Sequence, residues 1–208
     1  MGVSERRERE RQARREAVLT AARSVLLERG MRSTTTKEIA ERCELSEATL
    51  FFYFKNKDEI LLSLIFESID FWKEGLDRLK DSDLMAEPLL DAVWRFHEKV
   101  YVEHPAYFVI SAYFAQPQML ENISDEVKDQ IALRSGENFR RLASLLERVS
   151  TVAPGRILAD TIWSAFLGLT ISNTSRGNLG YGKAEAGTKI RAEVLEVLKS
   201  GLIAGKSS

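Results

Sequence analysis

The chain has 208 residues but only one cysteine and two histidines. The lone Cys43 excludes an internal disulfide and is typical of a reducing compartment, and its place in a helical pattern favours packing over redox chemistry. His97 and His104 stand seven residues apart, with no cysteine or converging carboxylate at ligand spacing. The sequence therefore predicts no metal site and no cofactor.

Long apolar runs are also missing. The longest uninterrupted apolar stretch is far too short to cross a bilayer, so we expect no membrane partner. The N-terminus is charged and no apolar stretch follows it, which predicts no signal peptide and a cytoplasmic location. With 44% hydrophobic and 29% charged residues, the composition is that of an ordinary globular chain. The length suits a small domain and a larger one.

Motifs that carry catalysis are absent as well. The sequence has no glycine-rich phosphate loop, no nucleophile elbow and no His-Glu-x-x-His pair. We therefore do not expect an enzyme.

Helical periodicity runs through most of the chain, and no β-alternation of useful length occurs. The fold class is predicted to be all-α, with about nine helices. The expected breaks and helix starts are Gly30, residues 81–83, Pro105, Ser124, Pro154 and residues 176–187. The last of these, a glycine-rich loop, should precede a short final helix.

Two short helices around a tight turn are predicted at residues 34–57. Thr35 can cap the first helix, and Glu38 stands three residues later at the spacing of a capping box. Ser46 can cap the second helix.

The second of these helices has two contrasting faces. Leu50 and Phe54 share one face and should be buried. The other face carries small and aromatic residues where a solvated helix would carry charges, which is typical of a helix that lies against DNA. A buried helical hairpin with an aromatic core is the alternative interpretation. The residues of this outer face are Glu47, Ala48, Thr49, Phe51 and Phe52.

This segment resembles the DNA-binding domain of the tetracycline-repressor (TetR) family over roughly residues 15–65. The family pattern appears as Thr34-Thr35, Ile39-Ala40, Ser46, Thr49-Leu50-Phe51, Tyr53-Phe54 and Lys57. Three positions depart from it. Glu44 replaces the turn glycine, so we expect a turn without a residue free to take positive φ. Ala48 replaces a second glycine, and Phe51 lacks the hydroxyl of a phosphate-contacting tyrosine.

The resemblance implies a homodimeric transcriptional regulator, a repressor released from double-stranded operator DNA by a small apolar effector. The expected domains are a charged extension at residues 1–16, a three-helix helix-turn-helix domain at 17–57, and a larger helical ligand-binding and dimerisation domain at 58–208. The residues expected to face bases, sugars or phosphates are Thr35, Ser46, Glu47, Ala48, Thr49, Phe51, Phe52, Lys55 and Lys57.

The formal net charge of −1 hides an asymmetry. Residues 1–57 hold thirteen Lys and Arg against nine Asp and Glu, whereas the remainder holds seventeen against twenty-two. A basic N-terminal module on an acidic body agrees with a DNA-binding head.

Arginine and glutamate alternate in residues 1–16. The pairs Glu5–Arg9 and Glu10–Arg14 stand four residues apart and would support a helix. We interpret the segment as a solvated helical extension. The alternative is an arm that reaches the minor groove beside the second short helix.

Aromatic residues concentrate in residues 71–114, where Trp94, His97 and Tyr101 recur on one helix face. Large rings that pack imperfectly can leave a cavity, and polar tips can orient a ligand inside it. An ordinary aromatic core is the alternative. The predicted site, for a fatty acyl thioester or a flat aromatic compound, comprises Trp72, Trp94, His97, Tyr101, Tyr107, Phe108, Tyr113, Phe114 and Trp163.

The last two helices are predicted to form a subunit interface. The final helix has a broad apolar face with little chain left to cover it, and the preceding helix offers small residues that permit close approach. The resemblance implies a four-helix interface across a twofold axis. The alternative is that these helices close the trunk on itself. The expected interface residues are Ala165, Gly168, Leu169, Val194, Val197, Leu198 and Leu202.

Two other functions stay open at this point. One is a DNA-binding protein without a ligand, which heat stabilisation by apolar small molecules would argue against. The other is an all-α enzyme, which binding to DNA-cellulose at low but not high salt would argue against.

Overall fold

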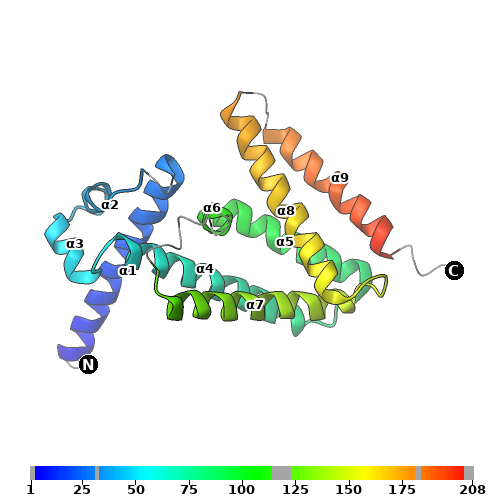
Figure 1. Cartoon of the computed structure of the whole chain (residues 1–208), viewed down its shortest axis with the longest axis horizontal. Helices are drawn as coiled ribbons and strands as arrows, with labels where there is room; N and C mark the ends of the chain where they lie inside the picture. The colour runs from blue at the N-terminus through cyan, green and yellow to red at the C-terminus, as the bar shows by residue number, and fades with distance from the viewer. Residues whose placement is uncertain (1–2, 31–32, 114–122, 181–183, 204–208) are drawn as a thin grey trace. The chain divides into compact units, whose positions relative to one another are not determined.

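The computed structural model describes residues 3–30, 33–113, 123–180 and 184–203. Over these ranges the backbone forms nine α-helices and no strand, which confirms the predicted fold class. The helices are α1 (Val3–Arg29), α2 (Thr36–Arg42), α3 (Glu47–Tyr53), α4 (Lys57–Lys80), α5 (Ala86–Glu103), α6 (Pro105–Tyr113), α7 (Asp125–Glu147), α8 (Gly155–Asn178) and α9 (Ala184–Ile203) (Figure 1).

The chain divides into two compact units. The first unit comprises residues 1–68 and 105–128, and the second comprises residues 69–104 and 129–208. The first unit therefore contains α1, α2, α3, α6 and the first half of α4. The second unit contains α5, α8, α9, most of α7 and the rest of α4.

The first unit is built around α1, which contacts α2, α3 and α6. Apolar residues recur at helical spacing along one face of α1, and apolar residues of the neighbouring helices complete the core. Each such buried side chain contributes roughly 1.5–3 kcal/mol relative to exposure. The most deeply buried members are Val18, Ala22, Val25, Leu26, Ile39, Leu50, Phe54, Ile60 and Leu64.

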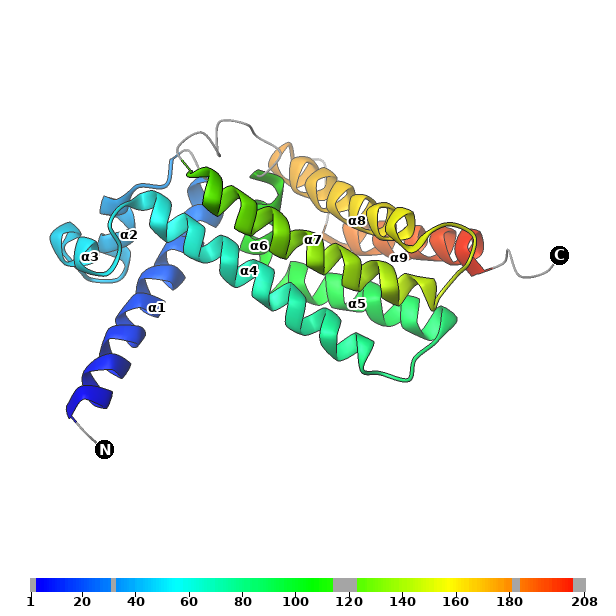
Figure 2. The same cartoon turned by 60° about the horizontal axis from the view of Figure 1, so that its bottom comes forward.

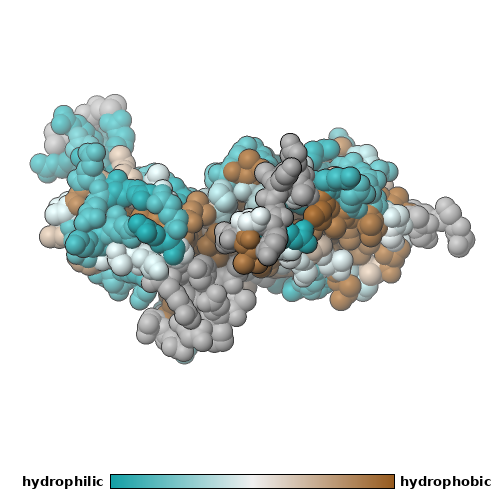
Figure 3. Space-filling view, turned by 90° about the horizontal axis from the view of Figure 1, so that it is seen from above, coloured by the Kyte–Doolittle hydropathy of each residue, from teal (hydrophilic) through white to brown (hydrophobic). Residues whose placement is uncertain are grey.

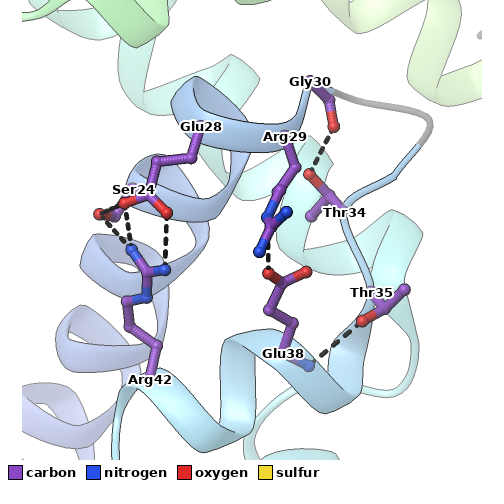
Figure 4. A network of polar contacts seen from close by, with 8 residues as sticks. All are labelled: Ser24, Glu28, Arg29, Gly30, Thr34, Thr35, Glu38 and Arg42. Carbon is purple, nitrogen blue, oxygen red and sulfur yellow. Dashed lines mark hydrogen bonds and ion pairs between the residues drawn. The ribbon is translucent and has the colours of Figure 1, made fainter.

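Polar contacts fix α2 against α1 (Figure 4). Arg42 of α2 donates two hydrogen bonds to the Glu28 carboxylate, one of them at 2.7 Å, and a third to the Ser24 hydroxyl at 3.0 Å. The Arg29 guanidinium donates to Glu38 at 3.1 Å. These pairs are solvent-accessible, so they fix the geometry of the contact more than they stabilise it.

α1 ends at Gly30, as the sequence predicted. Gly30 has φ 75°, a left-handed conformation that glycine adopts without strain, and its N–H donates to the Leu26 carbonyl at 2.9 Å. Its own carbonyl accepts a hydrogen bond from the Thr34 hydroxyl at 2.9 Å. These hydrogen bonds therefore join the end of α1 to the segment just before α2.

The second unit has an aliphatic core to which α4, α5, α7, α8 and α9 contribute. The residues of this core are Leu76, Leu89, Leu90, Val93, Leu142, Leu145, Leu146, Val149, Leu158, Ala159, Ile162 and Leu202.

α4 and α7 lie side by side in this unit (Figures 1 and 2). The Arg141 guanidinium of α7 donates to the Asp77 carboxylate of α4 at 3.0 Å. The Asn138 side-chain amide donates to the Ile69 carbonyl at 2.9 Å. These contacts align the two helices along their length.

One arginine closes the connection between α4 and α5. Arg148 donates to the Lys80 carbonyl at 3.0 Å and to the Ser82 and Leu84 carbonyls at 2.6 Å each. Backbone carbonyls that a helix end leaves without partners are thus satisfied by one side chain. The break predicted at residues 81–83 is confirmed.

The loop predicted at residues 176–187 was largely wrong. α8 continues to Asn178 and α9 begins at Ala184, so α9 has 20 residues and is not short. Gly187 lies inside α9, where a Cβ would overlap the Asn173 side chain of α8. Glycine here allows two helices to approach closely, a role that the sequence pattern did not distinguish from a loop.

Candidate functional site

The helix-turn-helix predicted from the sequence is formed by α2 and α3. The Thr35 hydroxyl caps α2 by accepting the Glu38 N–H at 3.2 Å. The Ser46 hydroxyl caps α3 by accepting the Thr49 N–H at 3.1 Å. Both predicted caps are confirmed, and each is worth about 1 kcal/mol.

The turn between these helices contains a left-handed residue that is not glycine. Glu44 has φ 55°, its N–H donates to the Glu41 carbonyl at 3.2 Å, and the Leu45 N–H donates to the Ala40 carbonyl at 2.9 Å. This is the hydrogen-bond pattern of a Schellman motif. The expectation of a turn without positive φ was wrong. The turn keeps its left-handed residue even though Glu44 is not glycine, and this conformation destabilises the fold by about 1–2 kcal/mol.

α3 separates its residues as predicted. Leu50 and Phe54 are buried at 0% and 1% exposure, whereas Phe51 and Phe52 are 45% and 76% exposed. The other predicted outer residues, Ser46, Glu47, Ala48 and Thr49, are exposed too. The short helix therefore presents two aromatic rings and three small or hydroxyl side chains to solvent.

Polar groups at the start of α3 are held in place before any partner binds. The Thr36 hydroxyl donates to the Glu47 carboxylate at 2.5 Å. The Ser46 and Thr49 hydroxyls lie 2.7 Å apart and hydrogen-bond to each other. This ordering lowers the entropy that recognition of a partner would otherwise lose.

The two predicted phosphate-contacting lysines differ in their surroundings. Lys55 is exposed, and its backbone N–H donates to the Glu59 carboxylate at 2.6 Å. Lys57 is half-buried, and its ammonium donates to the Thr34 carbonyl at 2.7 Å. Lys57 therefore also fixes the segment that precedes α2.

Sequence reasoning missed Arg15, which it placed in the N-terminal extension. The Arg15 guanidinium donates to the Tyr53 carbonyl at 2.6 Å and lies 4.1 Å from the centroid of the Phe54 ring. The C-terminal end of a helix carries partial negative charge on its carbonyls, which favours a cation at this end of α3. The contact joins residues 38 positions apart, so no local pattern could reveal it.

The profile of the bacterial regulatory proteins of the tetR family matches residues 18–64, from the middle of α1 to the first turns of α4. The chain belongs to the tetR family. The match contains all of α2, the turn and α3, and it includes Glu44 at the left-handed position.

Curated relatives of this tetR-family chain are transcriptional regulators of the helix-turn-helix type. YvkB of Bacillus subtilis is 50% identical over 48 residues, which is 23% of this chain and 25% of that protein. UidR of Escherichia coli K12 is 21% identical over 174 residues, which is 80% of this chain and 87% of that protein. The chain is therefore similar to the first over one domain and to the second over most of its length.

Solved structures agree over nearly the whole chain. The MbdR regulator from Azoarcus sp. CIB superposes with a TM-score of 0.73 at 21% identity, covering 90% of this chain and 98% of that one. FadR from Bacillus subtilis, in complex with stearoyl-CoA, gives 0.65 at 20% identity, with 90% and 98% covered. AibR, in complex with isovaleryl coenzyme A and operator DNA, gives 0.64 at 18% identity, with 91% and 97% covered. At these identities the likeness shows the fold.

In the second unit of this tetR-family chain, rings from three helices meet. Trp72 of α4 lies 4.9 Å from His97 of α5 and 5.3 Å from Trp163 of α8, measured between ring centroids. Phe166 of α8 lies 5.3 Å from His97 and 5.1 Å from Trp94. These five residues are called the aromatic cluster below, and four of the nine predicted ligand residues belong to it.

The geometry defines the tautomer of His97, a polar member of the aromatic cluster. Its Nδ1 lies 2.8 Å from the Val93 carbonyl, which can only accept, so Nδ1 carries the proton. Burial lowers the pKa of His97 to about 4, because a charged imidazolium would lose its hydration. His97 is therefore neutral near pH 7, and its Nε2 is a hydrogen-bond acceptor.

Nε2 of His97, an acceptor, and Nε1 of Trp94, a donor, have no hydrogen-bond partner among the described residues. Both side chains are buried at 1% exposure. A buried polar group without a partner destabilises a fold by about 1–3 kcal/mol. Such groups therefore suggest a function other than packing.

Tyr101 was predicted to join this cluster but has other contacts. The Tyr101 hydroxyl accepts a hydrogen bond from the Asn173 amide at 3.3 Å. The Arg191 guanidinium lies 5.0 Å from the centroid of the Tyr101 ring. The ring is half-buried between α5, α8 and α9.

The remaining predicted ligand residues lie in the first unit or outside the described residues. Tyr107 and Phe108 are buried in the first unit, where the Tyr107 hydroxyl donates to the Glu67 carboxylate. The side chain of Tyr113 and the whole of Phe114 lie outside the described residues. The sequence stretch 71–114 is thus divided between both units.

The outer surface of α8 and α9 carries exposed apolar and small residues. Val197 is 70% exposed, and Gly168 is exposed with no atom within 4 Å of the place where a Cβ would stand. Ile157 and Ile171 are 55% and 47% exposed, and the sequence analysis missed both. Figure 3 views this side of the second unit, and brown apolar patches gather over α8 and α9.

The predicted interface residues do not all reach this surface. Leu202 packs into the aliphatic core of its own chain and leaves little surface for a partner. Its neighbour Leu198 is half-buried and packs against the same core. Ala165, Leu169 and Val194 are half-buried. The apolar face of α9 serves its own unit first, because it covers the aliphatic core.

None of the described helices combines the length and the apolar composition that crossing a bilayer requires. Among the described residues, no three His, Cys, Asp or Glu side chains lie close enough to hold a metal ion together.

Proposed function

We propose that this tetR-family chain is a homodimeric repressor that a small ligand releases from its operator. The coarser statement, a DNA-binding transcriptional regulator, follows from the family. The observation that carries the proposal is the solvent-exposed face of α3. A surface helix that exposes Phe51 and Phe52 beside Ala48 and Thr49 suits a groove of DNA better than water.

In this proposal α3 enters the major groove with its N-terminal turn foremost. Ala48 lets the helix approach closely, and the Thr49 methyl or hydroxyl contacts a thymine methyl or a sugar. Phe52 packs against sugars or base edges. Thr35, Lys55 and Lys57 lie at the margins of this face and contact phosphates, which position the protein without reading sequence.

A second copy is needed because one seven-residue helix reads too few bases for a specific site. Two copies related by a twofold axis would place their α3 helices in successive major grooves, roughly 34 Å apart. We assign the contact to the exposed surface of α8 and α9. Gly168 supports this, because glycine in a helix costs about 1 kcal/mol relative to alanine and nothing in its own chain needs the space.

The effector is proposed to bind at the aromatic cluster. The rings offer an apolar surface, and the unpartnered nitrogens of His97 and Trp94 offer one acceptor and one donor. A ligand with an apolar body and a polar group that both donates and accepts would satisfy them. FadR with stearoyl-CoA and AibR with isovaleryl coenzyme A have this fold, which supports an acyl thioester as one candidate and leaves an aromatic compound as the other.

Release requires that the ligand prefer the conformation that does not bind DNA. A ligand with equal affinity for both conformations would change nothing, however tightly it bound. By linkage, operator DNA must then weaken ligand binding by the same factor.

The first experiment is selection of duplexes by the purified protein from a random pool, followed by mass spectrometry of compounds extracted from the protein. We expect an inverted-repeat site and loss of its binding when the extracted or a candidate ligand is added. Selection of no duplex above non-specific background would overturn the proposal. Selection without release by any compound would leave a ligand-independent DNA-binding protein.

The second experiment tests the effector site and uses two conservative variants. His97→Phe and Tyr101→Phe keep most of the volume and remove polar tips. We expect His97→Phe to bind the operator normally but to need more ligand for release. Tyr101→Phe should have the smaller effect, because Tyr101 lies outside the aromatic cluster. Release of both variants at the wild-type ligand concentration would place the effector elsewhere.

The dimer is tested with Gly168→Ala and Gly168→Arg. Because a Cβ at residue 168 meets nothing in its own chain, Gly168→Ala should leave the folded monomer intact and add helix stability of about 1 kcal/mol. We expect Gly168→Arg to give folded monomers in light scattering. A dimer that is unchanged in Gly168→Arg would place the interface on another surface.

A further inference from the structure

The N-terminal half of α1 extends beyond the core of the first unit. Residues 4–14 are all exposed, and burial begins at Arg15 and Val18. In Figures 1 and 2 this blue segment continues past α3 without another helix of the first unit beside it. Isolated helices of this length are marginal in water, so the segment gains little stability from its own chain.

The six arginines of this segment fall into two groups. Arg6 donates to the Glu10 carboxylate at 2.9 Å, and Arg9 donates to the Glu5 carbonyl at 3.3 Å. Arg15 binds the end of α3, as described above. The other three, Arg7, Arg11 and Arg14, make no hydrogen bond or ion pair with any described residue. We call these three the arginine stripe.

The arginine stripe has a regular place on α1. Its members stand at i, i+4 and i+7, so they share one face of the helix. Val18 and Val25 continue that face at i+11 and i+18, and both are fully buried in the core of the first unit. The stripe therefore continues the face of α1 that packs into the core of the first unit, at the point where the core ends.

Arg15 fixes the position of the arginine stripe relative to α3. Its hydrogen bond to the Tyr53 carbonyl and its position over the Phe54 ring join α1 to the C-terminal end of α3. The stripe begins one residue before this contact. Three guanidinium groups thus extend along a line from the end of the helix that is proposed to read DNA.

We infer that the arginine stripe binds the DNA phosphate backbone beside the groove that α3 enters. This inference rests on the proposed function, because it needs α3 in the groove. Seven residues of helix span about 10 Å, and one strand of B-DNA has a phosphate every 3.4 Å along the axis. The stripe can therefore meet two or three phosphates of one strand, and guanidinium groups bind phosphate oxygens in pairs of hydrogen bonds.

The composition of the segment favours DNA over a lipid surface. A helix that lies on a membrane needs an apolar face opposite its charges, whereas residues 4–14 contain one alanine and no larger apolar residue. The opposite face instead carries Glu5 and Glu16, which would be repelled by anionic lipid or by a second DNA strand. On the stripe side, Arg7, Arg11 and Arg14 have no ion-pair partner among the described residues.

A helical stripe on the phosphates differs from an arm that reaches the minor groove. An arm reads the groove in extended form and prefers A·T-rich sequence beside the site. A helical stripe on phosphates carries no sequence information and acts through salt-dependent binding alone. The two modes therefore give different results when salt and flanking sequence are varied.

The test compares two double variants of the full chain with equal charge changes. Arg7→Gln with Arg11→Gln removes two members of the stripe. Arg6→Gln with Arg9→Gln removes two arginines from the same turns that are already paired within the helix. Affinity for the duplex selected by the wild-type protein is measured by fluorescence anisotropy at several salt concentrations. Circular dichroism verifies that both variants keep their helix content.

We expect the stripe variant to reduce the slope of log affinity against log salt by about two units, since each phosphate contact contributes about 0.9. Its affinity at about 0.15 M salt should fall at least 10-fold. The paired control should change the slope by less than half a unit. Arg14→Gln, added to the stripe variant, should reduce the slope by about one further unit.

Three results would overturn the inference while leaving the proposed function standing. The stripe variant could keep the wild-type slope, or both double variants could reduce it equally, which would show a diffuse field. A loss confined to duplexes with A·T-rich flanks would instead establish a minor-groove arm. Failure of the wild-type protein to select any duplex would overturn the proposed function and the stripe together.

Discussion

The rings on the outer face of α3 and the rings of the aromatic cluster have opposite surroundings. In the first unit Phe51 and Phe52 stand exposed on a seven-residue helix. In the second unit Trp94 and His97 are 1% exposed and contact other rings. An exposed ring gives up the hydrophobic stabilisation that burial would provide, roughly 1.5–3 kcal/mol, unless a partner covers it. In the proposed function, the same type of side chain therefore contacts a large partner at α3 and packs or binds a small ligand in the aromatic cluster.

The polar contacts around α3 and those of the aromatic cluster also differ. In the first unit accessible arginines join helices: Arg42 and Arg29 join α1 to α2, and Arg15 joins α1 to α3. In the second unit the polar nitrogens of Trp94 and His97 are buried and have no partner among the described residues. Accessible ion pairs stabilise little but set geometry. Buried polar groups without partners destabilise a fold, and in the proposed function a ligand supplies the missing partners.

The largest expected effect is on stability in the second unit. Trp94→Ala should lower the free energy of unfolding by about 3–5 kcal/mol, because it removes a large ring from a closely packed site. Phe52→Ala is the matched control, and it should change stability by no more than about 0.5 kcal/mol, since that ring is 76% exposed. Chemical denaturation measures both. Equal losses of stability in both variants would contradict the contrast between the buried Trp94 ring and the exposed Phe52 ring.

Acid should destabilise the second unit through His97. Its pKa falls to about 4 in the folded state from an ordinary value of about 6.5, so the unfolded chain binds the extra proton first as pH falls. The contribution of neutral His97 to the free energy of unfolding is fully present above pH 6.5. It is lost as the pH falls from there through 4, by about 1 kcal/mol per pH unit. The difference in stability between the wild-type protein and His97→Phe, measured from pH 7 to 4.5, should follow this slope. A pH-independent difference would contradict a buried neutral imidazole.

Arg15 should matter to the first unit more than its place near the N-terminus suggests. Arg15→Met keeps apolar contact with the Phe54 ring but loses the hydrogen bond to the Tyr53 carbonyl. We expect a loss of about 1–2 kcal/mol, since a charged donor is involved but remains partly accessible. Arg15→Lys should recover part of it. If Arg15→Met unfolds at the same temperature as the wild-type protein, Arg15 contributes no stability to the first unit and belongs to the solvated extension.

The smallest expected effect is a gain. Glu44→Gly should stabilise the first unit by about 1 kcal/mol, because glycine accepts φ 55° without strain. Gly30→Ala is the opposite test at φ 75°, and it should destabilise by a similar amount or more. Differential scanning calorimetry compares the two. A loss of stability in Glu44→Gly would show that the Glu44 side chain contributes more than its backbone costs.

The local part of this structure could be predicted from the sequence, because its signals are local. Thr35 and Ser46 cap the helices that they precede, and Leu50 and Phe54 are buried as their spacing indicates. Short-range hydrogen bonds and helical periodicity decide these features, and both can be read along the chain. The family resemblance rests on the same residues.

The rest could not be predicted, because it depends on packing between distant residues. Gly187 looks like part of a loop until Asn173 is seen beside it. Leu202 looks like an interface residue until the core of its own unit is known. Tyr107 lies among aromatic neighbours in sequence but hydrogen-bonds to Glu67 in the first unit. Glycine and apolar residues give the same pattern for several environments, and only the tertiary structure distinguishes them.

The central claim is that the exposed face of α3 reads DNA, and Ala48→Glu tests it most directly. Ala48 is exposed in the first turn of α3, so a carboxylate there should change the stability of the protein by no more than about 0.5 kcal/mol. In the groove the same carboxylate would face base edges between two lines of phosphates, where like charges cost several kcal/mol. Affinity for the duplex selected by the wild-type protein should therefore fall by at least about 100-fold in an anisotropy titration. Unchanged affinity in a folded Ala48→Glu protein would show that α3 is not the helix that reads DNA.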